Sequence, residues 1–419
     1  MSNLTADIQA SILKAKNYVD ALTIKSSCNI PKEVVSDEHK FFSWDNEKRT
    51  PSVKPYLFDW SYYNGVVMEG LYDTYEARPD EGAEYKKYVL EYLNAMLVTD
   101  ENGVHHLSRN LAGYVDHHGA DCYKTAALVM KAFDENPAYA EVMAELYRDL
   151  TDPKHVNSKG DIVVEKYTED ALGNNYWHCW AGGQPPKYKV WLDGIYMLQP
   201  FLAHYAAKIG DTKQLAIINE RLNWVADVML APNGMYYHAC NSREDVCTYH
   251  WTRAMGWYAM AMVDVMEVLP ECYIEERKAA LKLFADGMLK YQDESGLWAN
   301  LADQPVTATN RLEVSGTAMM IYMMLKGVRK GWLNESYREP AIKAFNAIVN
   351  TKLHDNVLED IYLKASANNT NIMRSLNITF QMKEKEAVHL SWRTQKCYIC
   401  NYFGGSNFRA ANFILHVKF

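Results

Sequence analysis

Hydrophobic residues recur every three or four positions along most of the chain, which is the spacing of one face of an α-helix. The clearest segment is 250–268, whose helical spacing is carried by Ala254, Trp257, Tyr258, Ala261 and Val265. Alternating strand patterns are almost absent, so the sequence predicts an all-α protein. The predicted helices cover 5–23, 64–77, 83–98, 119–134, 137–149, 191–208, 212–229, 250–268, 274–290, 313–330 and 336–350.

The predicted helices group into hairpins, with a long polar loop after every second helix. A repeated helical hairpin is typical of a closed ring or of an open solenoid. Six hairpins in a ring would form a single (α/α)6-barrel domain over 1–419, which is the fold we expect, with the solenoid as the alternative. Loops of this length are usually functional, and in a ring they would gather at one end. They are the segments 24–60, 99–118, 151–190, 230–249 and 291–312.

Composition narrows the possible partners. The net charge of −8 argues against a nucleic acid or an anionic membrane, because both attract basic patches. No run approaches the roughly 20 apolar residues that cross a bilayer, and the first residues lack a secretion-signal pattern, so a cytoplasmic protein is expected. Eight scattered cysteines agree with that compartment. The 29 Tyr, 11 Trp and 12 Phe form core in most proteins, but they also line sites that hold sugar rings.

The first candidate segment is Tyr114-Val115-Asp116-His117-His118-Gly119-Ala120-Asp121, which opens a predicted helix. Asp116 or Asp121 could cap that helix by accepting hydrogen bonds from its free backbone amides, and this structural interpretation competes with a catalytic one. The adjacent histidines face different ways in a helix or strand, so they do not suggest a metal pair. We expect no metal or cofactor, since Walker, dinucleotide and HExxH motifs are absent from the sequence.

The second candidate is Asp193, which enters the otherwise apolar segment 191–205 beside Trp191. Helix capping is again the structural alternative. A carboxyl group among tryptophans and long apolar side chains would have its charged form desolvated and its pKa raised. A carboxylic acid in that state can serve as a general acid near neutral pH.

The third candidate is the segment His250-Trp251-Thr252-Arg253-Ala254-Met255-Gly256-Trp257. Arg253 and Trp257 are four residues apart and share a helix face. An arginine among aromatic rings is often a packing or cation–π element, but a guanidinium also matches a planar carboxylate with two parallel hydrogen bonds. His238 lies shortly before this segment, and a single histidine of this kind is more often structural than catalytic.

These segments resemble the unsaturated glucuronyl and rhamnogalacturonyl hydrolases of glycoside hydrolase family 105, in order from about residue 56 to 335. The resemblance rests on Trp60-Ser61-Tyr62-Tyr63-Asn64-Gly65-Val66, Val115-Asp116-His117-His118, Tyr176-Trp177-His178, Val190-Trp191-Leu192-Asp193-Gly194-Ile195-Tyr196-Met197, Tyr237-His238-Ala239, Trp251-Thr252-Arg253-Ala254-Met255-Gly256-Trp257-Tyr258 and Leu312-Glu313-Val314-Ser315-Gly316-Thr317-Ala318.

The resemblance implies an (α/α)6 barrel and an unusual hydrolysis. The implied substrate is an oligosaccharide that a polysaccharide lyase leaves with a 4,5-unsaturated uronic acid at its nonreducing end, such as unsaturated galacturonyl-rhamnose from pectin. Asp193 would protonate C4 of the vinyl ether, water would add at C5, and Asp116 would be the second carboxylate. Matching positions imply substrate contacts from Tyr62, His178, Trp191, His238, Trp251, Arg253 and Trp257.

Departures from the family keep two other functions open. Lys189, Val190, His250 and Thr252 replace more usual residues, and the C-terminal end, 371–419, is atypical. An inverting glycosidase on the same barrel would use Asp116 and Asp193 as base and acid, with their carboxyl groups roughly 6.5–9.5 Å apart. A non-catalytic carbohydrate-binding protein is the other alternative.

Overall fold

The structure, a computed structural model, describes residues 6–23, 60, 62–107, 120–151, 190–354 and 357–361. Eleven α-helices lie in this part of the chain, as the hydrophobic spacing predicts. The atypical end, 371–419, lies outside the described residues. The chain divides into two compact units, each described by itself: a first unit, Ser27–Arg221, and a second unit, Leu222–Phe419 with Met1–Ser26.

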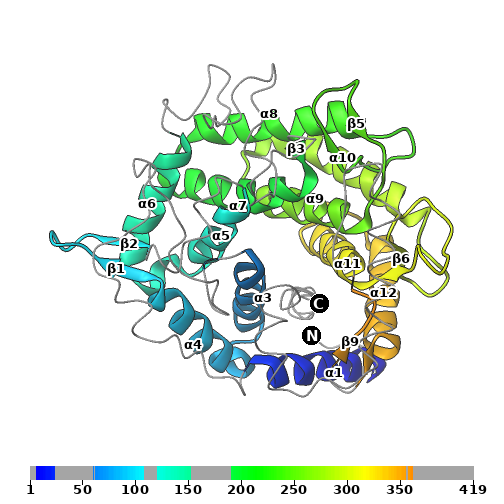
Figure 1. The fold of residues 1–419 in the computed structure, drawn as a ribbon, viewed down its shortest axis with the longest axis horizontal. Helices are drawn as coiled ribbons and strands as arrows, with labels where there is room; N and C mark the ends of the chain where they lie inside the picture. The colour runs from blue at the N-terminus through cyan, green and yellow to red at the C-terminus, as the bar shows by residue number, and fades with distance from the viewer. Residues whose placement is uncertain are drawn as a thin grey trace. The chain divides into compact units, whose positions relative to one another are not determined.

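The first unit contains two helical hairpins and the helix that follows them (Figure 1). Its helices are α3 (Tyr62–Ala77), α4 (Pro79–Ala95), α5 (Lys124–Lys131), α6 (Ala138–Thr151) and α7 (Leu192–Ile209). Helix α3 packs on α4 and α5, and α5 packs on α7. Short 3-10 helices flank α5 at Ala120–Tyr123 and Phe133–Glu135, so the single helix predicted over 119–134 is wrong in detail.

A buried ion cluster joins the three helices α3, α5 and α7. Lys124 at the start of α5 is fully buried and bonds Glu69 of α3. Its ammonium group also lies 4.2 Å from the ring centroid of Tyr196 on α7. The ammonium nitrogen of Lys131, the last residue of α5, lies 2.5 Å from the carboxylate of Asp73 and 3.3 Å from that of Glu69. Paired in this way, the buried charges fix how the three helices face one another.

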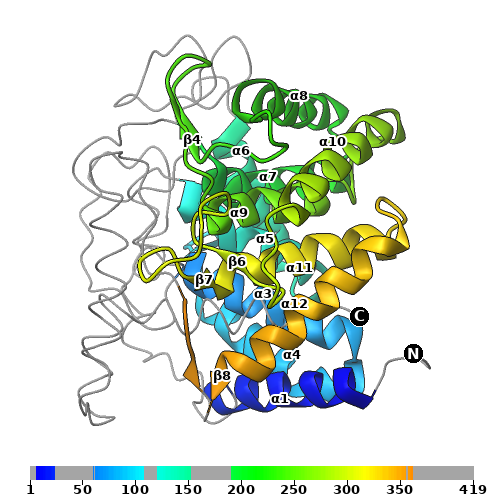
Figure 2. The same cartoon turned by 90° about the vertical axis from the view of Figure 1, so that its right-hand side faces the viewer.

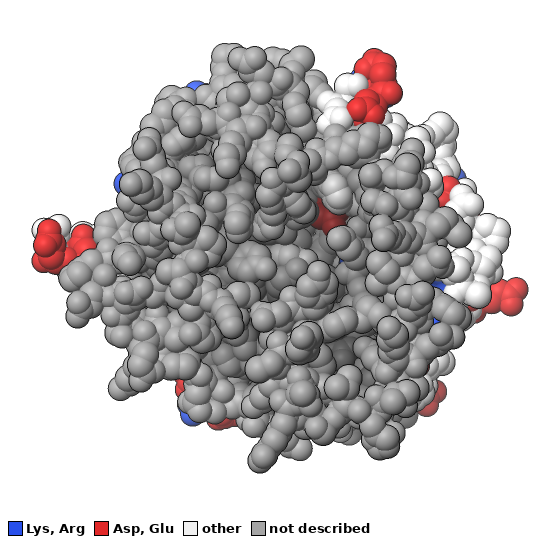
Figure 3. All heavy atoms as spheres, in the orientation of Figure 1, with Lys and Arg blue, Asp and Glu red and all other residues white. Residues whose placement is uncertain are grey.

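A strand hairpin follows α4 where the helical pattern predicts only helix and loop. The predicted helix 83–98 begins earlier, because Pro79 and the acidic residues after it suit a helix start, and it ends at Ala95. Strand β1 (Leu97–Thr99) then pairs antiparallel with β2 (His105–Leu107), which lies against α6. The tip of this hairpin carries acidic side chains (Figure 3).

The second unit contains the C-terminal part of α8 (Thr212–Met229) and all of α9 (Thr252–Val265), α10 (Glu271–Leu289), α11 (Val314–Arg329), α12 (Arg338–Thr351) and α1 (Ala6–Thr23). Helix α11 packs along α9 on one side and α12 on the other, and α1 lies beside α12 (Figures 1 and 2). Lys14 of α1 donates a 2.6 Å hydrogen bond to the carbonyl of Val349, which ties α1 to α12.

Very short strands connect the helices of the second unit. They are β4 (Ala239–Cys240) with β5 (Val246–Cys247), β6 (Trp298–Ala299) with β7 (Leu312–Glu313), and β8 (Leu353–His354) with β9 (Val357–Leu358), each pair antiparallel. In the first unit, β3 (Val190–Trp191) leads directly into α7. Elements of two residues carry no alternating pattern, so the sequence does not reveal them.

A second buried ion cluster lies between α9 and α11, at their C-terminal ends. Lys326 of α11 is buried, with its ammonium nitrogen 2.6 Å from Asp264 and 2.7 Å from Glu267. The hydroxyl of Tyr322 also donates a 2.6 Å hydrogen bond to Asp264, and Lys330 lies 2.8 Å from Glu267.

In the part of the chain that the structure describes, no helix has the length and apolar character needed to span a membrane.

Candidate active site

The nine predicted site residues divide among three groups. Asp116 and His178 lie outside the described residues. The first unit carries Tyr62, Trp191 and Asp193, and the second unit carries His238, Trp251, Arg253 and Trp257. Within the described ranges, no group of three or more His, Cys, Asp or Glu side chains has the arrangement of a metal site.

Asp193 is the second residue of α7 and is half-buried. The helix begins after Trp191, whose extended backbone (φ −126°, ψ 140°) makes it the N-cap residue, so Asp193 is not the N-cap. The following residues Gly194, Ile195 and Tyr196 are buried. Asp193 therefore stands at the N-terminal end of a helix whose next turn is apolar.

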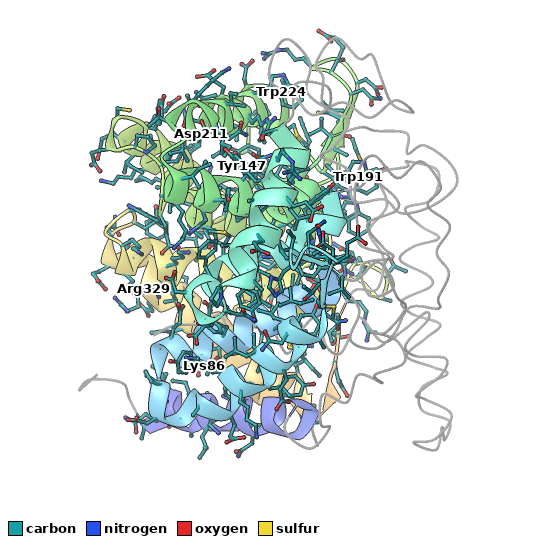
Figure 4. All side chains as sticks on the ribbon, turned by 90° about the vertical axis from the view of Figure 1, so that its left-hand side faces the viewer. Lys86, Tyr147, Trp191, Asp211, Trp224 and Arg329 are labelled. Atoms are coloured by element: carbon teal, nitrogen blue, oxygen red, sulfur yellow. The ribbon has the colours of Figure 1, made fainter. Side chains whose placement is uncertain are left out.

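Trp191 and the other end of α7 have different surroundings (Figure 4). Trp191 is half-buried at the helix start. Just beyond the C-terminal end of α7, Tyr147 of α6 donates a 2.8 Å hydrogen bond to Asp211. Asp211 in turn accepts a 2.9 Å bond from the backbone N–H of Gln214 at the start of α8. The C-terminal end is thus fixed by hydrogen bonds from neighbouring helices.

Tyr62 is the first residue of α3 and is half-buried. The structure starts this helix two residues before the predicted position 64. Tyr62, Trp191 and Asp193 therefore all lie at the N-terminal ends of helices of the first unit.

Arg253 is the second residue of α9, the position that Asp193 holds in α7. Here too the helix follows an extended tryptophan, Trp251 (φ −69°, ψ 117°), so the predicted helix start at 250 is two residues early. Arg253 is 8% exposed, and Trp257 lies one turn further along the same face and is 3% exposed. In both helices the second residue carries a charged side chain and follows an extended tryptophan by two positions. This side chain is a carboxyl group in α7 and a guanidinium in α9.

The position of Arg253 favours an anionic ligand. A helix N-terminus carries partial positive charge, so a cation there is unfavourable by about 0.3–1 kcal/mol. An anion would be stabilised by the guanidinium of Arg253. The charge of Arg253 therefore does not stabilise α9 through the helix dipole.

The start of α9 is held by the loop 300–311. The backbone N–H of Thr252 donates to the carbonyl of Asn300 at 2.9 Å, and its hydroxyl donates to the carbonyl of Ala299 at 2.5 Å. Asn310, buried in the loop, accepts a 2.8 Å bond from the N–H of Leu301 and donates to three backbone carbonyls at 3.0–3.1 Å. Sequence reasoning missed Asn310, since an asparagine among threonines looks like any polar loop residue.

Glu313 caps α11. Its carboxylate accepts hydrogen bonds from the N–H groups of Ser315 (2.9 Å) and Gly316 (2.6 Å) and from the Ser315 hydroxyl (2.5 Å). Its family-like segment thus has a structural role in this helix. The usual capping residues are Ser, Thr, Asp and Asn, so a glutamate gives little sequence signal for a cap.

Gly316 lets α11 touch the backbone that carries Arg253. A Cβ atom added to Gly316 would lie 2.6 Å from the backbone nitrogen of Arg253 and 2.6 Å from the carbonyl carbon of Thr252. Gly256 of α9 allows an equally close approach from the other side, since its Cβ would lie 2.4 Å from the sulfur of Met319. The start of α9 is therefore packed against α11 without room for a methyl group.

Gly316→Ala is expected to destabilise the protein by about 1–3 kcal/mol, because backbone atoms must move to admit the methyl group. The displacement of Arg253 should also raise KM. Thermal unfolding and steady-state kinetics would measure the two effects. Gly327→Ala in the same helix is the matched control: its Cβ would meet side-chain atoms of Leu333, from 2.8 Å, and no backbone atom, so a smaller change is expected. Equal effects of the two substitutions would contradict the close-packing explanation.

His238 is fully buried beside the start of α9. Its backbone N–H donates to the carbonyl of Tyr249 at 3.2 Å, two residues before Trp251. The structure therefore brings the His238 segment and the Trp251–Arg253 segment together within the second unit. Their geometry agrees with one binding region.

Comparison with known proteins identifies a family. The sequence model described as Glycosyl Hydrolase Family 88 matches residues 38–378. A protein of Agrobacterium fabrum is 35% identical over 109 residues, which are 25% of this chain and 46% of that protein. An unsaturated rhamnogalacturonyl hydrolase of Bacillus subtilis is 24% identical over 268 residues, 62% of this chain and 69% of the relative. The chain thus spans about half the length of the first of these relatives.

A solved structure confirms the fold class. A glycoside hydrolase of family 105 from C. acetobutylicum superposes with a TM-score of 0.62 at 21% identity, covering 87% of this chain and 94% of the other. The predicted all-α fold of the α/α-barrel class is therefore confirmed.

Proposed function

Because this chain belongs to glycosyl hydrolase family 88, we propose that it removes a 4,5-unsaturated uronic acid from the nonreducing end of lyase-generated oligosaccharides. The observation that carries the proposal is the buried Arg253 at the N-terminus of α9, with Trp251 before it and Trp257 one turn after it. A uronic acid combines a carboxylate with a sugar ring, and these residues suit both parts.

The sugar next to the uronic acid is proposed from the named relative. The Bacillus subtilis protein is called an unsaturated rhamnogalacturonyl hydrolase. This similarity supports unsaturated galacturonyl-rhamnose, from pectin, as the preferred substrate.

In the proposed reaction Asp193 delivers its proton to C4 of the C4=C5 vinyl ether. Positive charge then develops on C5 and the ring oxygen, and Asp116 would stabilise it as a carboxylate. Water adds at C5 and returns its proton to Asp193, which acts as base in this step. The resulting hemiketal opens and the remaining sugar leaves. The exposure of Asp193 on the first turn of α7 supports this role, because a proton donor must reach its substrate.

Arg253 would hold the uronate carboxylate through two parallel hydrogen bonds, assisted by the helix N-terminus. Trp191, Trp251 and Trp257 would form apolar walls for the sugar ring, with Tyr62, His178 and His238 as further substrate contacts. The family resemblance supports each of these roles.

The proposed function is tested with unsaturated disaccharides made by a polysaccharide lyase. Turnover should remove the ultraviolet absorbance of the double bond and release the neutral sugar, and the saturated analogue should not react. Cleavage of the saturated analogue with inverted stereochemistry would instead establish an inverting glycosidase. Saturable binding of the disaccharide without any turnover would establish a carbohydrate-binding protein.

Arg253→Lys is expected to raise KM at least about tenfold, because an ammonium group cannot make the paired hydrogen bonds of a guanidinium. Steady-state kinetics on the disaccharide and on its uronate methyl ester measure this. Esterification should weaken wild-type binding strongly and variant binding much less. Arg243→Lys, at an exposed arginine that pairs with Asp227 on the surface, is the control and should leave KM unchanged. If esterification weakened binding equally in wild type and in Arg253→Lys, the proposed hydrogen bonds between Arg253 and the uronate carboxylate would be contradicted.

A further inference from the structure

His250, directly before Trp251, is a buried side chain that the proposed reaction does not use. It is 3% exposed. Its Nδ1 atom lies 3.0 Å from the carbonyl oxygen of Tyr236, and its Nε2 atom lies 3.3 Å from the side-chain nitrogen of Asn233. Both partners belong to the turn that leads to His238.

The partners of His250 determine the direction of each hydrogen bond. A carbonyl oxygen only accepts, so Nδ1 carries the hydrogen and donates to Tyr236. The side-chain oxygen of Asn233 already accepts a 3.0 Å bond from the N–H of Met235, which points the amide nitrogen at the ring. Nε2 therefore accepts from Asn233.

Further contacts fix the ring plane and the backbone of His250. The ring stacks on Tyr237, with centroids 5.2 Å apart and planes 17° apart. Its Nε2 lies 3.9 Å from the carboxylate of Asp303. Its carbonyl accepts a 2.9 Å bond from the N–H of Ala302. One residue thus joins the turn 233–238, the loop 300–311 and the start of α9.

We propose that His250 is a positioning residue that holds the His238 segment against the Trp251–Arg253 segment, so that both meet the same sugar. The inference rests on the proposed function for the identity of the ligand. Loss of this link acts on substrate binding, while proton delivery from Asp193 keeps its own support in α7.

Three substitutions separate the contacts of His250. His250→Phe keeps the stacked ring and removes both hydrogen bonds. His250→Asn places an amide nitrogen near the position of Nδ1, so it can still donate to Tyr236. His250→Gln places an amide oxygen near Nε2, so it can still accept from Asn233. His354→Phe, at an exposed histidine of the same unit that bonds a backbone carbonyl, is the matched control.

Kinetics on the unsaturated disaccharide should show KM raised about tenfold or more in His250→Phe, with kcat within about threefold of wild type. His250→Asn should recover most of the loss. Without ligand, hydrogen exchange in His250→Phe should be faster than in wild type in peptides covering 233–240 and 249–257. The control variant His354→Phe should match wild type in every measurement.

The outcomes distinguish this inference from the proposed function. An inactive wild type would refute the proposed function, while faster exchange in His250→Phe alone would still demonstrate the link. An active wild type with unchanged KM in His250→Phe would overturn the positioning role. A fall in kcat alone would overturn it too, because the effect would then lie in the chemical step.

Discussion

Asp193→Asn is expected to lower kcat by about 10²–10⁴-fold, the range that general acid catalysis supplies. Asparagine has nearly the same shape as aspartate but cannot give a proton to C4 or accept one from water. KM should change little, because the amide still fits the site. The decay of the double-bond absorbance, followed over hours at high enzyme concentration, would measure the residual rate.

The control for Asp193→Asn is the same substitution at Asp134, an exposed residue of the same unit that forms only a surface pair with Lys208 at 3.3 Å. Asp134→Asn should have wild-type kinetics. Calorimetric titration should show that Asp193→Asn still binds the disaccharide. A variant that keeps more than about a tenth of wild-type kcat would rule out Asp193 as the proton donor.

Lys326→Met is expected to cost about 3–5 kcal/mol of stability, the usual cost of leaving a buried charge without its partner. Asp264 and Glu267 would lose the cation that lies between them, and Asp264 is 5% exposed. Denaturant unfolding at pH 7 would measure the loss. Lys278→Met is the control, since Lys278 pairs with the exposed Glu275 on the surface of α10 and such pairs contribute less than about 1 kcal/mol. Equal losses would contradict the assignment.

The same cluster predicts a pH dependence of stability. Burial alone would raise the pKa of Glu267, but Lys326 and Lys330 outweigh it and lower the pKa to about 2. A carboxyl group with a lowered pKa stabilises the folded state above its ordinary pKa, and the stabilisation disappears as pH falls through the lowered value. Wild type should therefore lose stability from about pH 4.5 to pH 2, by an amount on the order of 3 kcal/mol from this group. In Lys326→Met this slope should be shallower.

The helices are predictable from the sequence because each has a continuous apolar face. The bounds of α8, 212–229, agree with the prediction at both ends, and the other helices differ by a few residues at their starts or ends. Errors arise where polar residues begin a helix, as at Pro79, or where a tryptophan in the apolar pattern is extended, as at Trp251. Periodicity records which side chains are apolar, and backbone conformation at a helix start depends on tertiary contacts.

The candidate site was predictable only in part. The segments around Asp193 and Arg253 stand out because a charged side chain interrupts an apolar run. The residues that support them do not stand out. Gly316 matters through its distance from the backbone of Thr252, and Asn310 through bonds to carbonyls five to nine residues away. Such roles depend on chain folding that no local pattern encodes.

The loop 300–311 has a consequence for the thermodynamics of binding. Its outer residues are exposed, yet the buried side chain of Asn310 forms hydrogen bonds with four backbone groups inside the loop. The conformational entropy of this loop is therefore given up when the protein folds. A ligand that binds at the start of α9 meets a wall that is already ordered, so its affinity is not reduced by the ordering of a flexible segment.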